Sequence, residues 1–185
     1  AGDYEDQQSM FSDMLVLIIL IIIMVYMVMA SQFESFMSPF VIMFSLPFAI
    51  VGVIWGLTIT GTAMGVMAII GVIILLGIVV KNGIVLIDYT ILCRERGMSI
   101  VDASVEAARS RLRPILMTTL TTVLGMVPMA LGIGEGSEMW VSLGMVVCWG
   151  LTISTIVTLV LIPTVYCIFA TRQENRKARK SLMLK

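Results

Sequence analysis

Three polar residues interrupt one of the most apolar stretches of the chain and are its best candidates for chemistry. Residues 77–88 read GIVVKNGIVLID, so an ammonium, an amide and a carboxylate stand in an otherwise apolar helix: Lys81, Asn82 and Asp88. A charge near the centre of a bilayer costs at least about 3 kcal/mol, so such a residue usually faces protein or water and has a function. Lys81 and Asp88 are seven residues apart and share one helix face, on which Gly77 leaves room for a neighbouring helix. This pattern indicates the ion-handling helix of a transporter.

The composition of the chain predicts a membrane protein. Hydrophobic residues make up 59% of its 185 residues and charged residues only 13%, and no soluble domain of this size has enough interior to hide that much apolar surface. Five segments are long enough to cross a hydrocarbon core, which requires about 20 helical residues. We therefore expect an all-α integral membrane fold with five transmembrane helices, near residues 14–33, 38–58, 64–92, 113–133 and 138–170.

Glycine, proline and small polar residues predict where these helices turn, bend and pack. Residues 56–65 (GLTITGTAMG) suit the turn between the second and third helices, and Pro47 and Pro128 should bend the helices that contain them. Helices in lipid pack through small residues. Two stripes of such residues predict packing faces, namely Gly150, Ser154 and Thr158, and Thr118, Thr121, Thr122 and Gly125.

The link between the third and fourth helices should have a structure of its own. Ser99 can cap a helix in the Ser-x-x-Asp arrangement with Asp102, and apolar and charged residues then lie on opposite faces. This pattern predicts a short amphipathic helix over residues 99–110 on the inner membrane surface. Because proline is tolerated in the first turn of a helix, Pro114 predicts that the fourth transmembrane helix starts at about residue 113.

Basic residues gather in two segments that should both lie in the cytoplasm. Five arginines occupy the link after the third helix and six basic residues occupy the tail over residues 171–185, whereas the opposite ends carry only acids. Cytoplasmic loops of membrane proteins carry an excess of Lys and Arg. We therefore expect the N-terminus outside and the C-terminus in the cytoplasm, as five crossings require. Residues 1–13 should be the end of a periplasmic segment, and we expect the chain to be a fragment of a longer one.

Several kinds of chemistry have no support in the sequence. The chain has three cysteines without CxxC spacing and no histidine, which argues against a metal site and against a Ser/His/Asp triad. It also has no nucleotide-binding glycine motif. We therefore expect reduced thiols, no enzymatic activity, no metal, no cofactor and no nucleic-acid partner.

Three stretches together resemble the resistance–nodulation–division (RND) superfamily of efflux pumps. They are residues 25–36 (VYMVMASQFESF), 77–90 (GIVVKNGIVLIDYT) and 111–136 (RLRPILMTTLTTVLGMVPMALGIGEG). The resemblance covers nearly the whole chain and implies that its five helices are helices eight to twelve of a twelve-helix protomer. Residues 1–13 would be the last strand or linker of a periplasmic domain. The lysine in the second stretch favours the branch that exports hydrophobic and amphipathic compounds, including drugs.

The resemblance also implies an assembly and a source of energy. Members of the superfamily form homotrimers in the bacterial inner membrane, with a periplasmic adaptor and an outer-membrane channel as partners. They are antiporters that use the proton motive force, so protons would be the coupling ion. Helices one to seven and the periplasmic domains would be the remainder of the protomer.

By the same resemblance, residues of this chain belong to a proton relay. Lys81 matches the family's tenth-helix lysine, which pairs with two aspartates on the fourth helix. Arg111 and Thr118 match the arginine and the threonine at the start of the eleventh helix. Asn82 and Asp88 match positions that are usually polar and are secondary candidates for the relay.

Each of these residues also has a simpler interpretation. Lys81 can be a structural or snorkelling lysine, and Asp88 can be an interfacial acid near Arg94. Arg111 can be one more arginine on the cytoplasmic side, and Thr118 can be a packing residue.

Two other functions remain open. Sixteen methionines are compatible with a metal-exporting pump, although scattered methionine is more often a flexible filler of membrane helices. The chain can also be a truncated membrane half that binds partner helices in an assembly role and transports nothing.

The predicted orientation can be tested by cysteine labelling. In a background without Cys93, Cys148 and Cys167, a single cysteine at position 99 should be protected from a membrane-impermeant reagent added outside, and one at position 137 should react. The reason is that eleven of the twelve basic residues lie in the two segments predicted to be cytoplasmic. Reaction at 99 together with protection at 137 would overturn the orientation.

Overall fold

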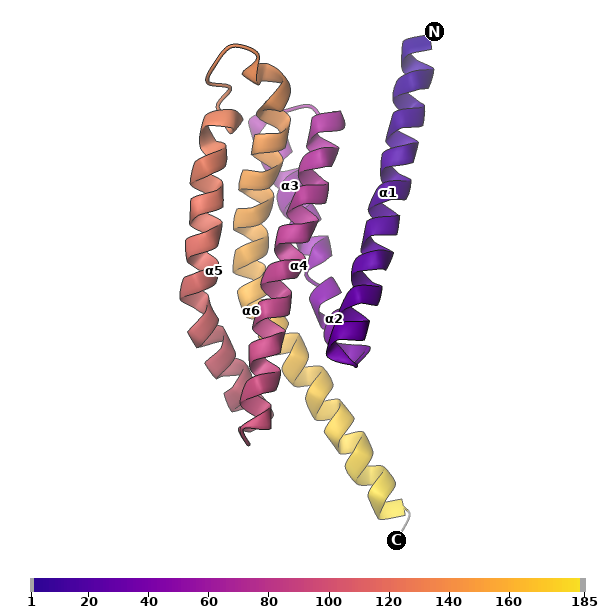
Figure 1. The fold of residues 1–185 in the computed structure, drawn as a ribbon, viewed down its shortest axis with the longest axis vertical. Helices are drawn as coiled ribbons and strands as arrows, with labels where there is room; N and C mark the ends of the chain where they lie inside the picture. The colour runs from indigo at the N-terminus through magenta and orange to yellow at the C-terminus, as the bar shows by residue number, and fades with distance from the viewer. Residues whose placement is uncertain (1, 184–185) are drawn as a thin grey trace.

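The chain folds into α-helices and one short 3-10 helix. The computed structural model describes the backbone of residues 2–183 and the side chains of residues 8–176 and of Arg179. Its elements are α1 (Gly2–Phe33), α2 (Met37–Met43), α3 (Leu46–Thr60), α4 (Val66–Glu95), α5 (Ile100–Ala130), η1 (Ser137–Trp140) and α6 (Val141–Met183) (Figure 1). The expected all-α fold is confirmed. Its described residues contain five spans long and apolar enough to cross a membrane, with α2 and α3 together forming the second.

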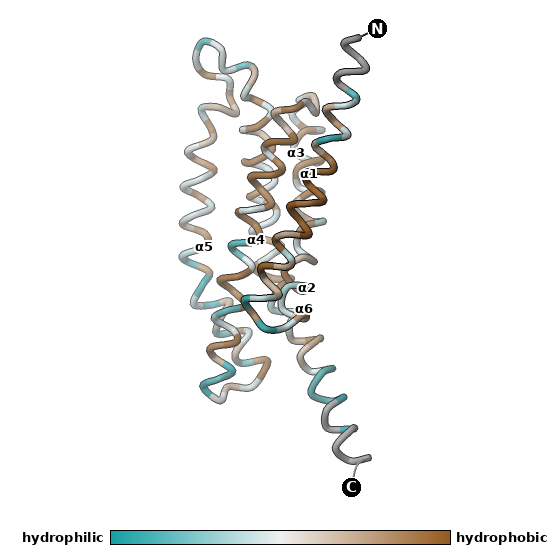
Figure 2. Tube along the Cα trace, turned by 45° about the vertical axis from the view of Figure 1, so that its right-hand side comes forward, coloured by the Kyte–Doolittle hydropathy of each residue, from teal (hydrophilic) through white to brown (hydrophobic). Residues whose placement is uncertain are grey.

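Four of the helices form a bundle, and the first helix stands apart at one end. Helix α6 contacts α3, α4 and α5. Helix α1 approaches α2 and α4 with its C-terminal end, whereas its N-terminal half lies away from the bundle (Figure 1). At the other end, the last turns of α6 extend beyond the bundle. Figure 2 shows hydrophobic residues concentrated along α1 and α4, whereas α5 is paler and turns hydrophilic toward its lower end.

Helix α6 lies close to its neighbours because it presents glycines to them. A Cβ added to Gly150 would lie 2.3 Å from Leu75 Cδ2 on α4, and one added to Gly144 would lie 2.7 Å from the backbone nitrogen of Ala130 on α5. Backbones therefore approach as closely as small-residue packing allows. The packing face predicted on α6 is confirmed, since all three of its members are buried: Gly150, Ser154 and Thr158.

The packing face predicted on the fourth transmembrane helix is wrong for the contacts within this chain. Its members are exposed or half-buried: Thr118, Thr121, Thr122 and Gly125. Instead Thr119 is buried, and its hydroxyl oxygen lies 3.1 Å from that of Thr155 on α6. A stripe of small residues indicates where a helix can pack, but it does not identify the face that has a partner.

The two ends of the chain differ from the predicted boundaries. Residues 2–13 are the first turns of α1, not the strand or linker that was predicted, and α6 continues through residue 170 to Met183. The side chains of several predicted terminal charges lie outside the described residues: Asp3, Glu5, Asp6, Lys177, Lys180 and Lys185.

The second span is interrupted close to the proline that was expected to bend it. Helices α2 and α3 meet at residues 44–45, where the Ser45 hydroxyl donates to the Ile42 carbonyl at 2.7 Å. Pro47 lies in the first turn of α3, where its missing N–H would have no helical partner anyway. Helix α3 continues to Thr60 and is ended by Gly61, with φ +63°. The predicted turn is therefore in the right place but is confined to residues 61–65.

Helix α5 is continuous where the sequence predicts two helices. The predicted cap is confirmed, because Ser99 accepts a hydrogen bond from the Asp102 backbone N–H at 3.1 Å. The predicted start at residue 113 is wrong, and Pro114 lies inside one helix. The reason lies in the buried side, where residues recur every four positions on both sides of the proline: Ala103, Ala107, Ile115 and Thr119. Buried contacts on both sides of the proline hold the two halves in one helix despite the hydrogen bond that proline removes.

The close approach of α5 and α6 predicts a strong effect of one methyl group. Gly144→Ala should destabilise the fold by about 1–3 kcal/mol, because its Cβ would meet the backbone of Ala130, which has no rotamer to change. Thermal unfolding in detergent measures this difference. The matched control is Gly125→Ala on α5, where an added Cβ meets no atom within 4 Å. If both variants unfold at the wild-type temperature, the close approach is wrong.

Candidate functional site

Lys81 and Asp88 lie on an open face of α4. Both residues are exposed, and so is Gly77, where an added Cβ would find no atom within 4 Å. The buried residues of α4 lie on other faces, which pack against α6 and its neighbours. The seven-residue spacing therefore places the two charges on one face, as predicted, and that face is open within the described part of the chain.

A groove of about 370 Å³ lies between α1 and this face. Its lining is apolar apart from one ammonium group: Met24, Val25, Val28, Met29, Gly77, Val80, Lys81, Ile84 and Val85. Lys81 makes no hydrogen bond or ion pair with any residue that the structure describes. An unpaired ammonium in lipid is costly, so in a membrane this surface must face water or a protein group that accepts a hydrogen bond or carries a negative charge.

Asn82 lies beside the open face but inside the bundle. It is 8% exposed. It lies seven residues before Tyr89, so the two side chains share the side of α4 that faces α5. Of the polar residues 81, 82 and 88, only the amide is thus brought into the packed interior.

Arg111 packs on an aromatic ring that the sequence analysis did not select. Its guanidinium carbon lies 4.7 Å from the centre of the Tyr89 ring on α4, which is a cation–π contact. The Arg111 Nε atom is buried and has no hydrogen-bond partner among the described residues. The signal for Tyr89 was its place near the end of an apolar helix, where a ring with a polar tip is favourable. Nothing in the sequence linked it to an arginine 22 positions away.

Thr118 follows Arg111 by seven residues and lies on the same side of α5. It is exposed, and its hydroxyl donates to the Ile115 carbonyl at 2.9 Å. Because α4 and α5 are antiparallel (Figure 1), the contact between Arg111 and Tyr89 sets their register and places Thr118 level with Asn82. The structure thus brings the predicted relay residues to neighbouring sides of α4 and α5. It joins none of them by a hydrogen bond or ion pair among the described residues.

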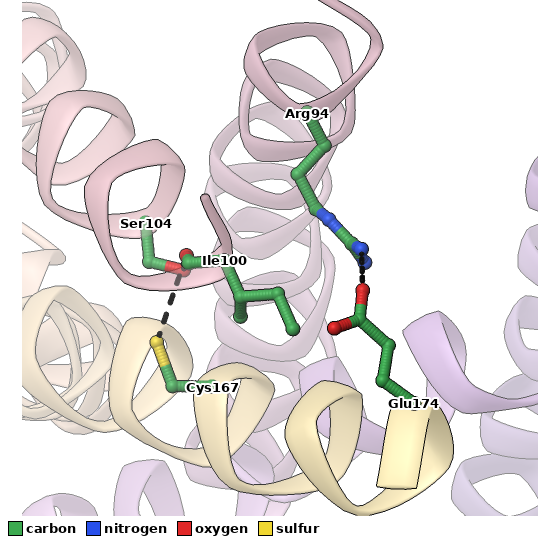
Figure 3. Close-up of polar contacts among 5 residues, drawn as sticks. All are labelled: Arg94, Ile100, Ser104, Cys167 and Glu174. Atoms are coloured by element: carbon green, nitrogen blue, oxygen red, sulfur yellow. Dashed lines mark hydrogen bonds and ion pairs between the residues drawn. The ribbon is translucent and has the colours of Figure 1, made fainter. Parts of the chain in front are cut away.

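The one ion pair of the described residues links α4 to α6. Arg94 pairs with Glu174, and nearby Cys167 Sγ lies 3.9 Å from the Ile100 carbonyl oxygen (Figure 3). The carboxylate that pairs with Arg94 is therefore that of Glu174, and Asp88 stays a prediction as an interfacial acid or a relay residue. Both side chains of the pair are partly exposed, so the pair contributes at most about 1 kcal/mol. Its effect is to fix where the end of α6 leaves the bundle.

The contact between Arg111 and Tyr89 can be measured by its effect on stability. Tyr89→Leu should lower the free energy of unfolding by about 0.5–2 kcal/mol, because the guanidinium loses the face of the ring. Tyr89→Phe is the matched control and should keep most of the wild-type stability, since it retains the ring. Equal unfolding temperatures for the Leu and Phe variants would show that the contact contributes nothing.

Comparisons with known proteins assign this arrangement to a family. A family model described as the AcrB/AcrD/AcrF family matches residues 1–170. Two crystal forms of a heavy metal efflux pump have similar structures, one with a TM-score of 0.82 at 31% identity and the other with 0.79 at 30%. Each match covers 91% of this chain but 16% of the pump, so the chain spans about one sixth of that length. The chain belongs to the AcrB/AcrD/AcrF family, and so to the RND superfamily of efflux transporters.

Proposed function

We propose that this chain forms helices eight to twelve of a proton-driven efflux pump of the bacterial inner membrane. The observation that carries the proposal is the exposed ammonium of Lys81, which faces an apolar groove without a counter-charge among the described residues. A helix that brings carboxylates to this groove would complete the site. By the family resemblance, that helix is the fourth of the same protomer, and its two aspartates are the partners of Lys81.

The chemistry of such a site is a charge switch. When both carboxylates are ionised, they attract Lys81, and each charge offsets part of the desolvation of the other. Protonation of the carboxylates releases the lysine, so the two protonation states favour different arrangements of the helices. Arg111 and Thr118 lie on the adjacent side of α5 and would face the same partner helix. Asp88 extends the polar surface of α4, and Asn82 adds an amide beside it on the buried side of the helix.

The energy of the proton gradient is sufficient for this work. Holding a solute at a thousandfold gradient costs about 4 kcal/mol. One proton that moves through about 150 mV releases about 3.5 kcal/mol. One or two protons per transported molecule are therefore enough.

The transported compounds define two candidate functions. The first is antiport of hydrophobic or amphipathic compounds, including drugs, which follows from the resemblance of the segment around Lys81. The second is metal export, which is favoured by the similarity to a heavy metal efflux pump and by the methionines of α1 that line the groove, Met24 and Met29.

The remaining features of the proposal concern assembly and orientation. Family membership supports a homotrimer that works with a periplasmic adaptor and an outer-membrane channel. The N-terminus would be periplasmic and the C-terminus cytoplasmic. Because the chain spans about one sixth of the length of the pumps it resembles, transport would require the rest of the protomer, and the chain alone would move no solute.

Replacing the lysine tests the proposed function. In the full-length pump, Lys81→Ala should abolish proton-driven export, because carboxylates left without their counter-charge would keep their protons and arrest the cycle. Export from energised vesicles should be measured with an amphipathic dye and, separately, with heavy-metal ions. The class of compound that the wild-type pump accumulates then decides between the two candidate functions.

A matched control is available on the same face of α4. Ile74→Ala removes a side chain that is 39% exposed and lies seven residues before Lys81, and it should leave export nearly unchanged. Wild-type export by a well-expressed Lys81→Ala trimer would contradict the role of the lysine.

A further inference from the structure

Two buried polar side chains near the middle of the bundle have no hydrogen-bond partner in the described part of the chain. Thr158 on α6 is 2% exposed, and its Oγ1 atom is buried without a partner. Asn82 on α4 is 8% exposed, and its amide makes no hydrogen bond to a described residue. Buried polar groups are normally hydrogen-bonded, and in lipid no bulk water replaces a missing bond. The fully buried Thr158 hydroxyl therefore requires a partner, and the Asn82 amide, whose atoms are not fully enclosed, is free to take part in bonding.

Contacts made one or two turns away show where Asn82 points. Leu75 and Tyr89 lie seven residues before and after it and so share its stripe on α4. Leu75 packs against Gly150 of α6, and Tyr89 packs against Arg111 of α5. Asn82 therefore points into the seam between α4, α5 and α6.

Thr158 points into the same seam from the other side. Three residues earlier, Thr155 is hydrogen-bonded to Thr119 of α5. Four residues later, the Cδ1 atom of Ile162 lies 3.1 Å from the position of a Cβ on Gly83 of α4. Gly83 directly follows Asn82, so Thr158 and Asn82 lie within about one helical turn of the same level.

We propose that this seam holds a buried water molecule that bridges the Asn82 amide and the Thr158 hydroxyl. The two side chains do not bond to each other directly, and a water molecule can donate to one and accept from the other. The hydroxyl oxygens of Thr119 and Thr155 are 3.1 Å apart. One hydroxyl donates its hydrogen to the other, and the hydrogen of the second hydroxyl stays free to donate a third hydrogen bond to the water. Buried waters in proteins make about three hydrogen bonds, which matches these partners.

The position of this water gives it a defined structural effect. It would link α6 to α4 at Asn82, the residue next to Lys81. The polar segment of α4 would then be bonded to the bundle on its buried side, and its open side would stay free for a partner. The inference rests on the packing of α4, α5 and α6 and does not depend on the proposed transport.

High-resolution structures of the full chain in lipid nanodiscs test the proposal. The wild-type map should show ordered density within hydrogen-bond distance of both Thr158 Oγ1 and the Asn82 amide, and the Thr158→Val map should lack it. Thr158→Ser keeps the hydroxyl and should keep the water. The matched control is Thr164→Val on the same helix, because that hydroxyl is exposed and already donates to the Val160 carbonyl at 2.7 Å. An empty seam in the wild type, with each side chain bonded to its own helix or directly to the other, overturns the proposal.

Thermal unfolding of a double-mutant cycle gives an independent readout. Thr158→Val and Asn82→Leu should each lower the Tm by about 2–4 °C, and the double variant should fall little further, because either change already removes the bridge. The Tm of Thr164→Val should stay at the wild-type value. Additive losses in the double variant would show that the two residues share no bridging molecule.

Discussion

The charge of Lys81 is the constraint on which the rest of this structure depends. An apolar helix face can be covered by lipid at no cost. A face that carries an ammonium group must be covered by protein or water. The structure leaves this face free and packs every other side of α4 around it. The packing of the bundle thus leaves one polar helix face, that of α4 with Lys81, uncovered within the membrane-spanning part.

Helix α6 packs closely against three helices, in part through residues with little or no side chain. Glycines at positions 144 and 150 bring α5 and α4 close to α6, so small shifts would create clashes. The pair of Arg94 and Glu174 holds the far end. By contrast, α1 contacts the bundle over a short length, which leaves the groove beside Lys81 accessible from one side. The polar helix α4 is therefore packed along most of its length, whereas α1 contacts the bundle only near one end.

Hydrophobicity and spacing predicted the class and the polar face, and they failed where packing decides. Five apolar spans, the cap at Ser99 and the shared face of Lys81 and Asp88 all follow from composition and helical period. Continuity of α5 through Pro114 depends on a buried stripe whose partner is distant in sequence. The contacts of Arg111 with Tyr89 and of Arg94 with Glu174 join residues 22 and 80 positions apart. No local pattern encodes such pairs, and they became visible only in the folded chain.

The proline inside α5 has a mechanical consequence. Pro114 lacks the N–H that would bond to the Ser110 carbonyl, so one backbone hydrogen bond of the helix is missing at that point. Arg111 lies before Pro114 and Thr118 lies after it. Buried residues of α5 contact the bundle both before and after the proline. Pro128 removes a second such bond near the end of the helix, so Pro114 is the proline at which the middle of α5 can bend. A bend at this point would change the angle between the half of α5 that carries Arg111, which contacts Tyr89 of α4, and the half that carries Thr118.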